Sequence, residues 1–405
     1  MIYKALKHRF RAETITLLFL ISPLFLHAQN NGDIKPLTAD NVKITSKILN
    51  EDRKVYIYVP PADSTNPAKR YPVLYLMDGE SHFSMIAELC RYLSRWDVNV
   101  IPEMIVVGIP NTNRTRDLTP THSIIDYYGK PDTSSTSWLK PSGGNNKFLQ
   151  FIGDELMPYV DLHYKTQPFK ILAGHSFGGI AAINCLLNKP DMFNAFVAVS
   201  PSFWWDREYL LKLADEKLKK GSTYNKILFY SDASEGVADK STFHINLLKF
   251  DSLIVRNQIK GLSHKYVYYP DDIHMTEPVK AYYDALRFIY LEWNLPPFDP
   301  KMVNSAVIMK HYHELSLRYG YTILPNEVNI NDWASYLMKN GETLDNAISL
   351  FEMNTVNFPS SYKAFGSLGD AYAKKGQKQK ATACYKKAIE LNPAATNIED
   401  KLKSL

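Results

Sequence analysis

The feature that most constrains the fold is the pentapeptide Gly-His-Ser-Phe-Gly at residues 174–178. A short apolar run at residues 171–173 precedes it, and an apolar run with helical spacing at residues 180–187 follows it. A serine in the pattern Gly-x-Ser-x-Gly between a strand and a helix occupies a sharp turn that exposes its hydroxyl. The two glycines are required because the strained turn leaves no room for side chains. The pattern predicts that Ser176 is a nucleophile, and an ordinary glycine-rich turn is the alternative.

Strand and helix signals alternate from about residue 40 to residue 295, which indicates an α/β domain with a mostly parallel sheet. The expected strands are residues 42–49, 54–59, 73–77, 104–109, 196–199, 227–230 and 266–269. Expected helices include residues 86–93, 148–160 and 180–187. We assign residues 29–297 to this domain.

Residues 111–146 show little periodicity and are rich in Thr, Ser, Pro, Asn and Gly. A loop of this length inside a compact domain is usually functional, such as a lid or a substrate-binding loop, and a disordered excursion is the alternative. Arg114 and Arg116 lie near its start. We expect Arg114 to bind an acidic group of a substrate. An internal salt bridge, for instance with Asp117, is the structural alternative.

The last hundred residues contain a repeat with a spacing of 34 residues, typical of tetratricopeptide units. The repeated pairs are Ala347 and Ala381, Phe351 and Tyr385, and Pro359 and Pro393. We expect units at about residues 329–360 and 362–395 in an all-α segment, residues 298–405, closed by a capping helix at residues 397–405. Because two units are too few for an independent solenoid, this segment should dock on the α/β domain. A protein partner is a further expectation for it.

The first 28 residues have the features of a cleavable signal peptide: a basic start, an apolar stretch at residues 15–26 and the small residue Ala28. We therefore expect cleavage after Ala28 and a periplasmic or secreted location, with no membrane span in the mature chain. Loss of four basic residues and Glu13 lowers the net charge from +5 to +2, which gives no reason to expect a nucleic-acid partner.

Metal and cofactor motifs are absent from the sequence. There is no His-Glu-x-x-His pattern or close Cys/His cluster, although His311 and His313 are near neighbours, and we expect no metal and no cofactor. The three cysteines, Cys90, Cys185 and Cys384, lie in helical apolar patterns and are expected to be structural thiols.

A serine nucleophile needs a base and a third group that orients the base. His274 is the candidate base, because it follows the late strand at residues 266–269, where catalytic loops of open α/β sheets lie. The acid should lie between the serine and the histidine in the chain. Glu235 is the first choice and Asp232 the second, both shortly after the strand at residues 227–230.

Two further groups of residues are expected to surround a substrate. The backbone N–H of Phe177, with those of Gly79 and Glu80 after the strand at residues 73–77, would bind a developing oxyanion. Trp204 and Trp205, after the strand at residues 196–199, would form an aromatic wall, and burial in the core is the alternative for both.

Together these features resemble the putative-esterase family of α/β-hydrolases, which includes esterase D, the enterochelin esterases and the feruloyl and acetyl-xylan esterases. The resemblance covers about residues 40–295 and rests on residues 73–79, on the serine turn and on Ser-Pro-Ser-Phe-Trp-Trp at residues 200–205. It implies an α/β-hydrolase fold, with Ser176, Glu235 and His274 as nucleophile, acid and base. Many members carry Asp where this chain has Glu at position 235.

The leading hypothesis is therefore an exported serine esterase that forms an acyl-enzyme on a sugar acyl ester or a siderophore-type ester. Peptide cleavage or acyl transfer to another acceptor would use the same residues. The competing hypothesis is a scaffold in which the tetratricopeptide segment binds a protein partner and the hydrolase domain is vestigial. A complete serine, acid and histidine set argues against the second hypothesis.

Overall fold

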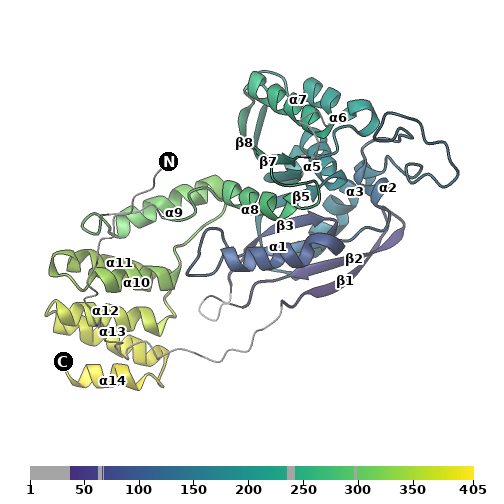
Figure 1. Ribbon diagram of the computed structural model, residues 1–405. Helices are drawn as coiled ribbons and strands as arrows, with labels where there is room; N and C mark the ends of the chain where they lie inside the picture. The colour runs from purple at the N-terminus through teal and green to yellow at the C-terminus, as the bar shows by residue number, and fades with distance from the viewer. Residues whose placement is uncertain (1–36, 63–65, 67, 235–241, 296–298) are drawn as a thin grey trace, which may run out of the picture. The chain divides into compact units, whose positions relative to one another are not determined.

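The computed structural model describes residues 37–62, 66, 68–234, 242–295 and 299–405 (Figure 1). Residues 37–405 form one compact unit. The expected signal peptide, residues 1–28, lies outside the described residues, and so does Glu235. No helix in the described part of the chain is long and apolar enough to cross a membrane.

An eight-stranded sheet organises the first part of the chain, in the order β1-β2-β4-β3-β5-β6-β7-β8. Its strands are β1 Asp40–Ser46, β2 Glu51–Tyr58, β3 Tyr71–Met77, β4 Ile105–Ile109, β5 Thr166–His175, β6 Ala195–Val199, β7 Thr223–Ala233 and β8 Lys260–Tyr269. β2 is antiparallel to β1 and β4, and every pair from β4 to β8 is parallel. The predicted α/β fold with a mostly parallel sheet is confirmed.

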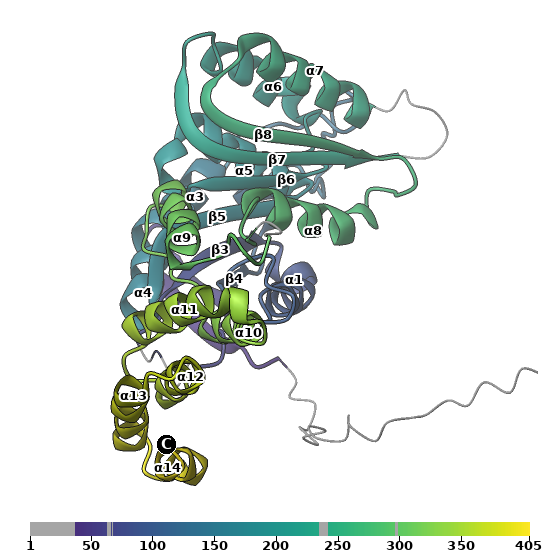
Figure 2. The same cartoon turned by 90° about the vertical axis from the view of Figure 1, so that its left-hand side faces the viewer.

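Helices cover both faces of the sheet (Figure 2). They are α1 Gly79–Leu93, α2 Arg114–Leu118, α3 Asn145–Phe151, α4 Met157–His163, α5 Phe177–Asn188, α6 Trp205–Lys217, α7 Thr242–Asn257 and α8 Glu277–Ile289. The helix expected at residues 148–160 is interrupted, since the π-helical turn η1, Ile152–Leu156, joins α3 to α4. A short 3₁₀ turn η2, Pro190–Met192, follows α5.

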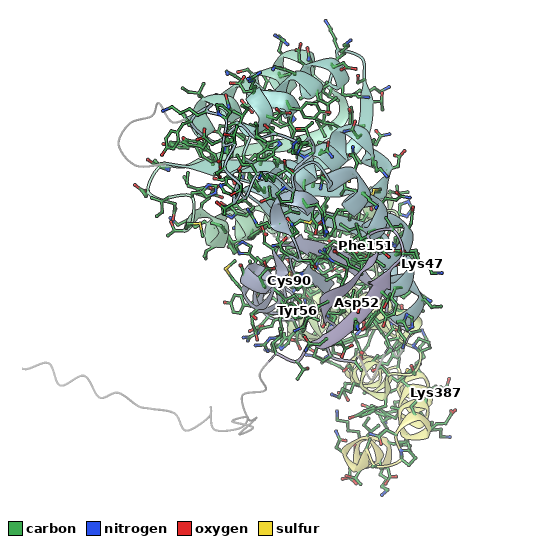
Figure 3. All side chains as sticks on the ribbon, turned by 90° about the vertical axis from the view of Figure 1, so that its right-hand side faces the viewer. Lys47, Asp52, Tyr56, Cys90, Phe151 and Lys387 are labelled. Atoms are coloured by element: carbon green, nitrogen blue, oxygen red, sulfur yellow. The ribbon has the colours of Figure 1, made fainter. Side chains whose placement is uncertain are left out.

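The two faces form separate apolar cores because side chains alternate along a strand. In β3, Leu74 and Leu76 enter the core shared with α1 and α8, whereas Val73 and Tyr75 enter the core shared with α3, α5 and α7. Figure 3 labels one buried side chain from each core, Cys90 of α1 and Phe151 of α3. All three cysteines are unpaired.

The C-terminal part of the chain is helical. Its elements are α9 Ser305–Tyr319, α10 Glu327–Leu337, the 3₁₀ turn η3 Gly341–Thr343, α11 Leu344–Asn357, α12 Tyr362–Lys374, α13 Lys378–Leu391 and α14 Thr396–Lys403. α10 and α11 lie in the span expected for the first repeat unit, with η3 between them, and α12 and α13 lie in the span expected for the second; the bounds of the units stay a prediction. In the second hairpin Gly369 is required, because a Cβ there would lie 2.4 Å from Cε1 of Tyr385.

Tyr319 at the end of α9 joins the helical segment to the α/β part. Its hydroxyl donates a buried hydrogen bond of 3.0 Å to the carbonyl of Ile289, at the end of α8. Its ring centroid lies 5.2 Å from that of Phe169 in β5 and 5.2 Å from that of Tyr290. The helical segment therefore shares an apolar core with one face of the sheet.

Candidate active site

Ser176 occupies the turn between β5 and α5 with φ 60° and ψ −112°, a conformation that a residue with a side chain rarely adopts. Its backbone N–H donates to the carbonyl of Val199 at 2.9 Å. A Cβ on Gly174 would lie 2.3 Å from the backbone of Gly178, and one on Gly178 would lie 3.1 Å from Cβ of Met77. The Gly-x-Ser-x-Gly pattern therefore reflects a backbone crossing that tolerates only glycine.

The hydroxyl of Ser176 lies beside a second serine. Ser176 Oγ is 3.1 Å from Ser202 Oγ, and the backbone N–H of Ser202 donates to the carbonyl of Ser176 at 3.3 Å. Ser202 is buried, whereas Ser176 is partly exposed. In the sequence Ser202 stands out only as part of the run at residues 200–205, and no local signature indicates its contact with Ser176.

The loop between β8 and α8 places His274 against the serine turn. The ring centroid of His274 lies 4.4 Å from that of His175, the residue directly before Ser176. On another side it lies 5.1 Å from the ring of Phe243 in the first turn of α7. The loop that carries the expected base thus packs against the turn that carries the expected nucleophile, 98 positions earlier in the chain.

Two neutral histidines, His175 and His82, lie near His274. Burial, together with smaller effects of the nearby His274, His82 and Arg114, lowers the pKa of His175 to about 2. Its Nε2 atom is buried and has no hydrogen-bond partner among the described residues. The ring of His82, on α1, lies 5.7 Å from His175, and burial also lowers its pKa. Both imidazoles are therefore uncharged at neutral pH.

Asp232, the second choice for the acid, lies at the end of β7 and is buried. Its carboxylate accepts from the hydroxyl of Tyr266 at 2.9 Å and pairs with Nδ1 of His244 at 2.7 Å. These contacts join β7 to β8 and to α7. Since Glu235 is outside the described residues, the identity of the acid stays a prediction.

The turn expected to help bind an oxyanion lies between β3 and α1. Asp78 adopts a left-handed conformation there, with φ 52° and ψ 45°. Gly79 and Glu80 begin α1, as Phe177 begins α5, and backbone N–H groups in a first helical turn have no intrahelical acceptor. Since β3 and β5 are parallel neighbours, both helix starts lie at the same sheet edge. Gly79 is required, because a Cβ there would lie 2.6 Å from the backbone nitrogen of Ile109.

Arg114 connects this turn to the serine turn. Its guanidinium donates to Asp78 through Nε at 2.7 Å and Nη2 at 3.0 Å, and Nη2 also donates to the carbonyl of His175 at 3.3 Å. Its Cζ lies 5.1 Å from the ring centroid of Phe177. The cation therefore contacts the residues on both sides of Ser176. Arg114 forms an internal salt bridge, with Asp78 rather than Asp117, yet 38% of its side chain stays exposed.

A buried ion network holds α2, from which Arg114 projects. Arg53 of β2 donates to Asp117 at 2.6 Å, and Arg116 donates to Glu51 at 2.6 Å and to Asp117 at 2.7 Å. The hydrogen bonds from Arg116, followed by the weaker effect of Arg53, lower the pKa of Glu51. These ion pairs fix the start of the long loop to the sheet.

Aromatic rings surround Phe177. Trp138 stacks on it at 5.9 Å, and Trp204 and Trp205 lie 5.9 and 5.2 Å away. Trp205 is buried, and its indole N–H donates to the carbonyl of Thr121 at 3.2 Å, so its side chain belongs to the core. Trp204 is only partly buried, and Trp138 is 52% exposed.

The long loop contributes two aromatic residues that the sequence reasoning did not single out. One is Trp138, and the other is Tyr127, whose ring lies 5.5 Å from Trp204 and stacks on Phe243 at 5.4 Å. The signal in the sequence that could have indicated them is the presence of large aromatic residues in a stretch rich in Thr, Ser and Pro. In the described residues, no group of three or more His, Cys, Asp or Glu side chains could hold a metal ion.

Two family models match this chain, one in the α/β part and one in the helical part. Residues 46–246 match the family model described as putative esterase, and residues 362–394 match the tetratricopeptide repeat model.

Curated relatives match the α/β part. The chain is 32% identical to ferri-bacillibactin esterase BesA of Bacillus subtilis over 175 residues, which are 41% of this chain and 60% of the relative. It is 35% identical to a siderophore enterobactin esterase of Emericella nidulans over 150 residues, 34% of this chain and 48% of the relative. The chain thus spans about half to three fifths of the length of these relatives.

Solved structures extend the similarity. An IroE-like serine hydrolase from Shewanella oneidensis is 29% identical, with a TM-score of 0.69, and the match covers 78% of this chain and 99% of that chain. An uncharacterised protein from Capnocytophaga ochracea, 17% identical with a TM-score of 0.60, covers 90% of this chain and 100% of its own. At that identity the second match shows the fold alone.

Proposed function

Because residues 46–246 match the family model described as putative esterase, we propose that this protein is an exported serine esterase that hydrolyses a carboxylic ester. The observation that carries the proposal is the placement of Ser176 in a strained strand-to-helix turn with the ring of His274 packed against that turn.

The reaction follows from these groups. Ser176 Oγ attacks the ester carbonyl while His274 takes the hydroxyl proton. The backbone N–H groups of Phe177, Gly79 and Glu80 stabilise the negative charge on the carbonyl oxygen. When the tetrahedral intermediate breaks down, His274 returns the proton to the departing alcohol. Water, activated by the same histidine, then releases the acid from the acyl-enzyme.

Glu235 is our first choice for the group that orients His274, and Asp232 is the second. For Asp232 the support is weaker, since its described contacts are with His244 and Tyr266. Variants at both positions separate the choices: loss of the orienting carboxylate should lower kcat by about 10⁴-fold, as in other triads, with little change in KM.

A siderophore-type ester is the substrate class that the named relatives support, and a sugar acyl ester is the alternative. We assign Arg114, whose guanidinium stays partly exposed, to the binding of an acidic group of the substrate. Trp204, which is partly buried, and Trp138, which is 52% exposed, supply aromatic surface beside Phe177. We assign substrate contact to Trp204 and a supporting role to the buried Trp205.

The decisive experiment compares the mature protein with Ser176→Ala and His274→Ala on a short nitrophenyl ester and on a trilactone siderophore. Loss of either side chain should lower kcat by at least 10³-fold. A fluorophosphonate should add one adduct mass to Ser176 in the unaltered protein and none to the alanine variant. An unchanged rate in Ser176→Ala would disprove the proposal.

Export is tested separately. N-terminal sequencing of the protein recovered outside the cytoplasm should begin at Gln29, after cleavage at Ala28. A protein that retains Met1 would contradict this part.

The match to the tetratricopeptide repeat favours a second candidate function, the binding of a protein partner by the helical segment. A chromosomal Ser176→Ala replacement distinguishes the two. It should abolish the cellular phenotype if the protein acts as an esterase and preserve that phenotype if it acts as a scaffold.

A further inference from the structure

We propose that Ser202 is a further catalytic residue, which donates its hydroxyl hydrogen to Ser176 Oγ and stabilises the charge that develops there during attack. The inference rests on the proposed serine mechanism and adds a residue to it.

The contact itself is direct. Ser202 Oγ lies 3.1 Å from Ser176 Oγ, and in the described part of the chain it is the one side chain that forms a hydrogen bond with the nucleophile. Ser202 is 1% exposed, so little water competes for its hydroxyl. A hydrogen bond from a buried hydroxyl to a reacting oxygen is electrostatically stronger than the same bond in water.

The backbone around Ser202 is fixed before any substrate binds. Its N–H donates to the carbonyl of Ser176 at 3.3 Å, and its carbonyl accepts from the N–H of Trp205 at 3.0 Å. The preceding Pro201 packs tightly on α5, because a Cβ on Gly179 would lie 3.0 Å from its Cα. The Ser202 hydroxyl is therefore pre-positioned.

A buried carboxylate anchors the same segment. Ser200, with φ 38°, donates its backbone N–H to the carbonyl of Ser231 at 2.8 Å. The hydroxyls of Ser200 and Ser231 both donate to Glu277, which is fully buried at the start of α8. The ends of β6 and β7 are thus tied to the helix that follows the His274 loop.

The direction of the hydrogen bond follows from the chemistry. Ser176 must direct its own proton to the base, so during attack Ser202 is the donor and Ser176 Oγ the acceptor. As the proton leaves, Oγ becomes anionic, and hydrogen bonds to charged acceptors are the stronger ones. After acylation the same oxygen is an ester oxygen, a weak acceptor. The contact is therefore stronger in the transition state than in the states on either side.

The test measures the acylation step in Ser202→Ala. The burst of nitrophenol and the labelling of Ser176 by a fluorophosphonate should both slow by about 10- to 100-fold, the effect of losing one hydrogen bond to a charged group, with KM nearly unchanged. Ser46→Ala is the matched control, since it also removes a buried serine hydroxyl, one that donates to Glu155 at 2.5 Å at the far edge of the sheet. Its acylation rate should stay within twofold of the unaltered protein.

Two results would overturn the inference. An acylation rate in Ser202→Ala equal to that of the unaltered protein would show that the contact does not contribute. A faster rate would show that Ser202 holds Ser176 in an unreactive rotamer. If Ser202→Ala does not fold, Ser202→Cys takes its place, and its weaker S–H donor should give a smaller loss of rate than a missing donor. Failure of the serine mechanism itself is recognised separately, by activity in Ser176→Ala.

Discussion

The rings of His175 and His274 pack with their centroids 4.4 Å apart, so the residue before the nucleophile supports the expected base. His175 is buried, and its ring centroid lies 5.7 Å from that of His82. The row of imidazoles links β5, α1 and the loop after β8. A neutral ring in the middle of this row does not repel an imidazolium at position 274 during turnover.

We predict that the stability of the protein falls in acid because of His175. Its pKa is about 2 in the folded protein and about 6.5 in the unfolded chain, so between these values the unfolded chain binds the extra proton. The contribution of neutral His175 to the free energy of unfolding is fully present above pH 6.5. It declines as the pH falls below 6.5, by up to about 1.4 kcal/mol per pH unit. Urea midpoints at pH 7 and pH 5 measure the decline. His175→Phe keeps the ring and should show a shallower decline, and an equal slope in both proteins would contradict the prediction.

The serine turn should not tolerate a single added methyl group. In Gly174→Ala the new Cβ would meet the backbone of Gly178 at 2.3 Å, which neither chain segment can relieve without leaving the turn. We expect loss of esterase activity and a destabilisation of about 3 kcal/mol or more. Gly341→Ala is the control, because a Cβ there has nothing within 4 Å. Activity assays and thermal unfolding of both variants give the answer, and an active Gly174→Ala enzyme would count against the proposed turn geometry.

The serine turn and the His274 loop could be predicted from the sequence because each has a local signature. The turn is a five-residue pattern whose glycines cannot be replaced by residues with a side chain. The loop follows a recognisable late strand. The sheet was predictable for the same reason, since buried parallel strands are continuous apolar runs. The two repeat hairpins were predictable from their spacing of 34 residues.

The contacts between distant segments could not be predicted in this way. Arg114 pairs with Asp78, 36 positions earlier, because the segments after β3 and β4 lie side by side, whereas the sequence suggested the nearby Asp117. Ser202 reaches Ser176 through a segment whose backbone conformation depends on the buried Glu277. The core position of Trp205 depends on Thr121 in the long loop. Each of these relationships is a tertiary contact with no local periodicity.

Arg114 and Asp78 should prove coupled in both stability and activity. Arg114→Ala leaves the buried carboxylate of Asp78 without its cation and should cost about 1–2 kcal/mol, a figure reduced for the partial exposure of the arginine. Arg114→Lys keeps the charge but loses the bidentate geometry, so kcat/KM should still fall.

A double-mutant cycle tests this coupling. Asp78→Asn removes the charge while an Asn side chain still tolerates the left-handed backbone of that turn. Together with Arg114→Ala it should cost less than the sum of the single changes. Additive effects on both the urea midpoint and kcat/KM would show that the two residues act independently.

The helical segment should unfold together with the α/β part because Tyr319 belongs to a core that both share. Tyr319→Ala removes a buried ring between Phe169 and Tyr290 and should cost about 3–5 kcal/mol, whereas Tyr319→Phe loses only the hydrogen bond to Ile289, about 1 kcal/mol. Tyr336→Ala on α10, an exposed ring, is the control and should change stability by less than about 0.5 kcal/mol. Calorimetry should show one transition for the unaltered protein. Two separate transitions, with only the smaller one shifted by Tyr319→Ala, would mean that the segment folds independently.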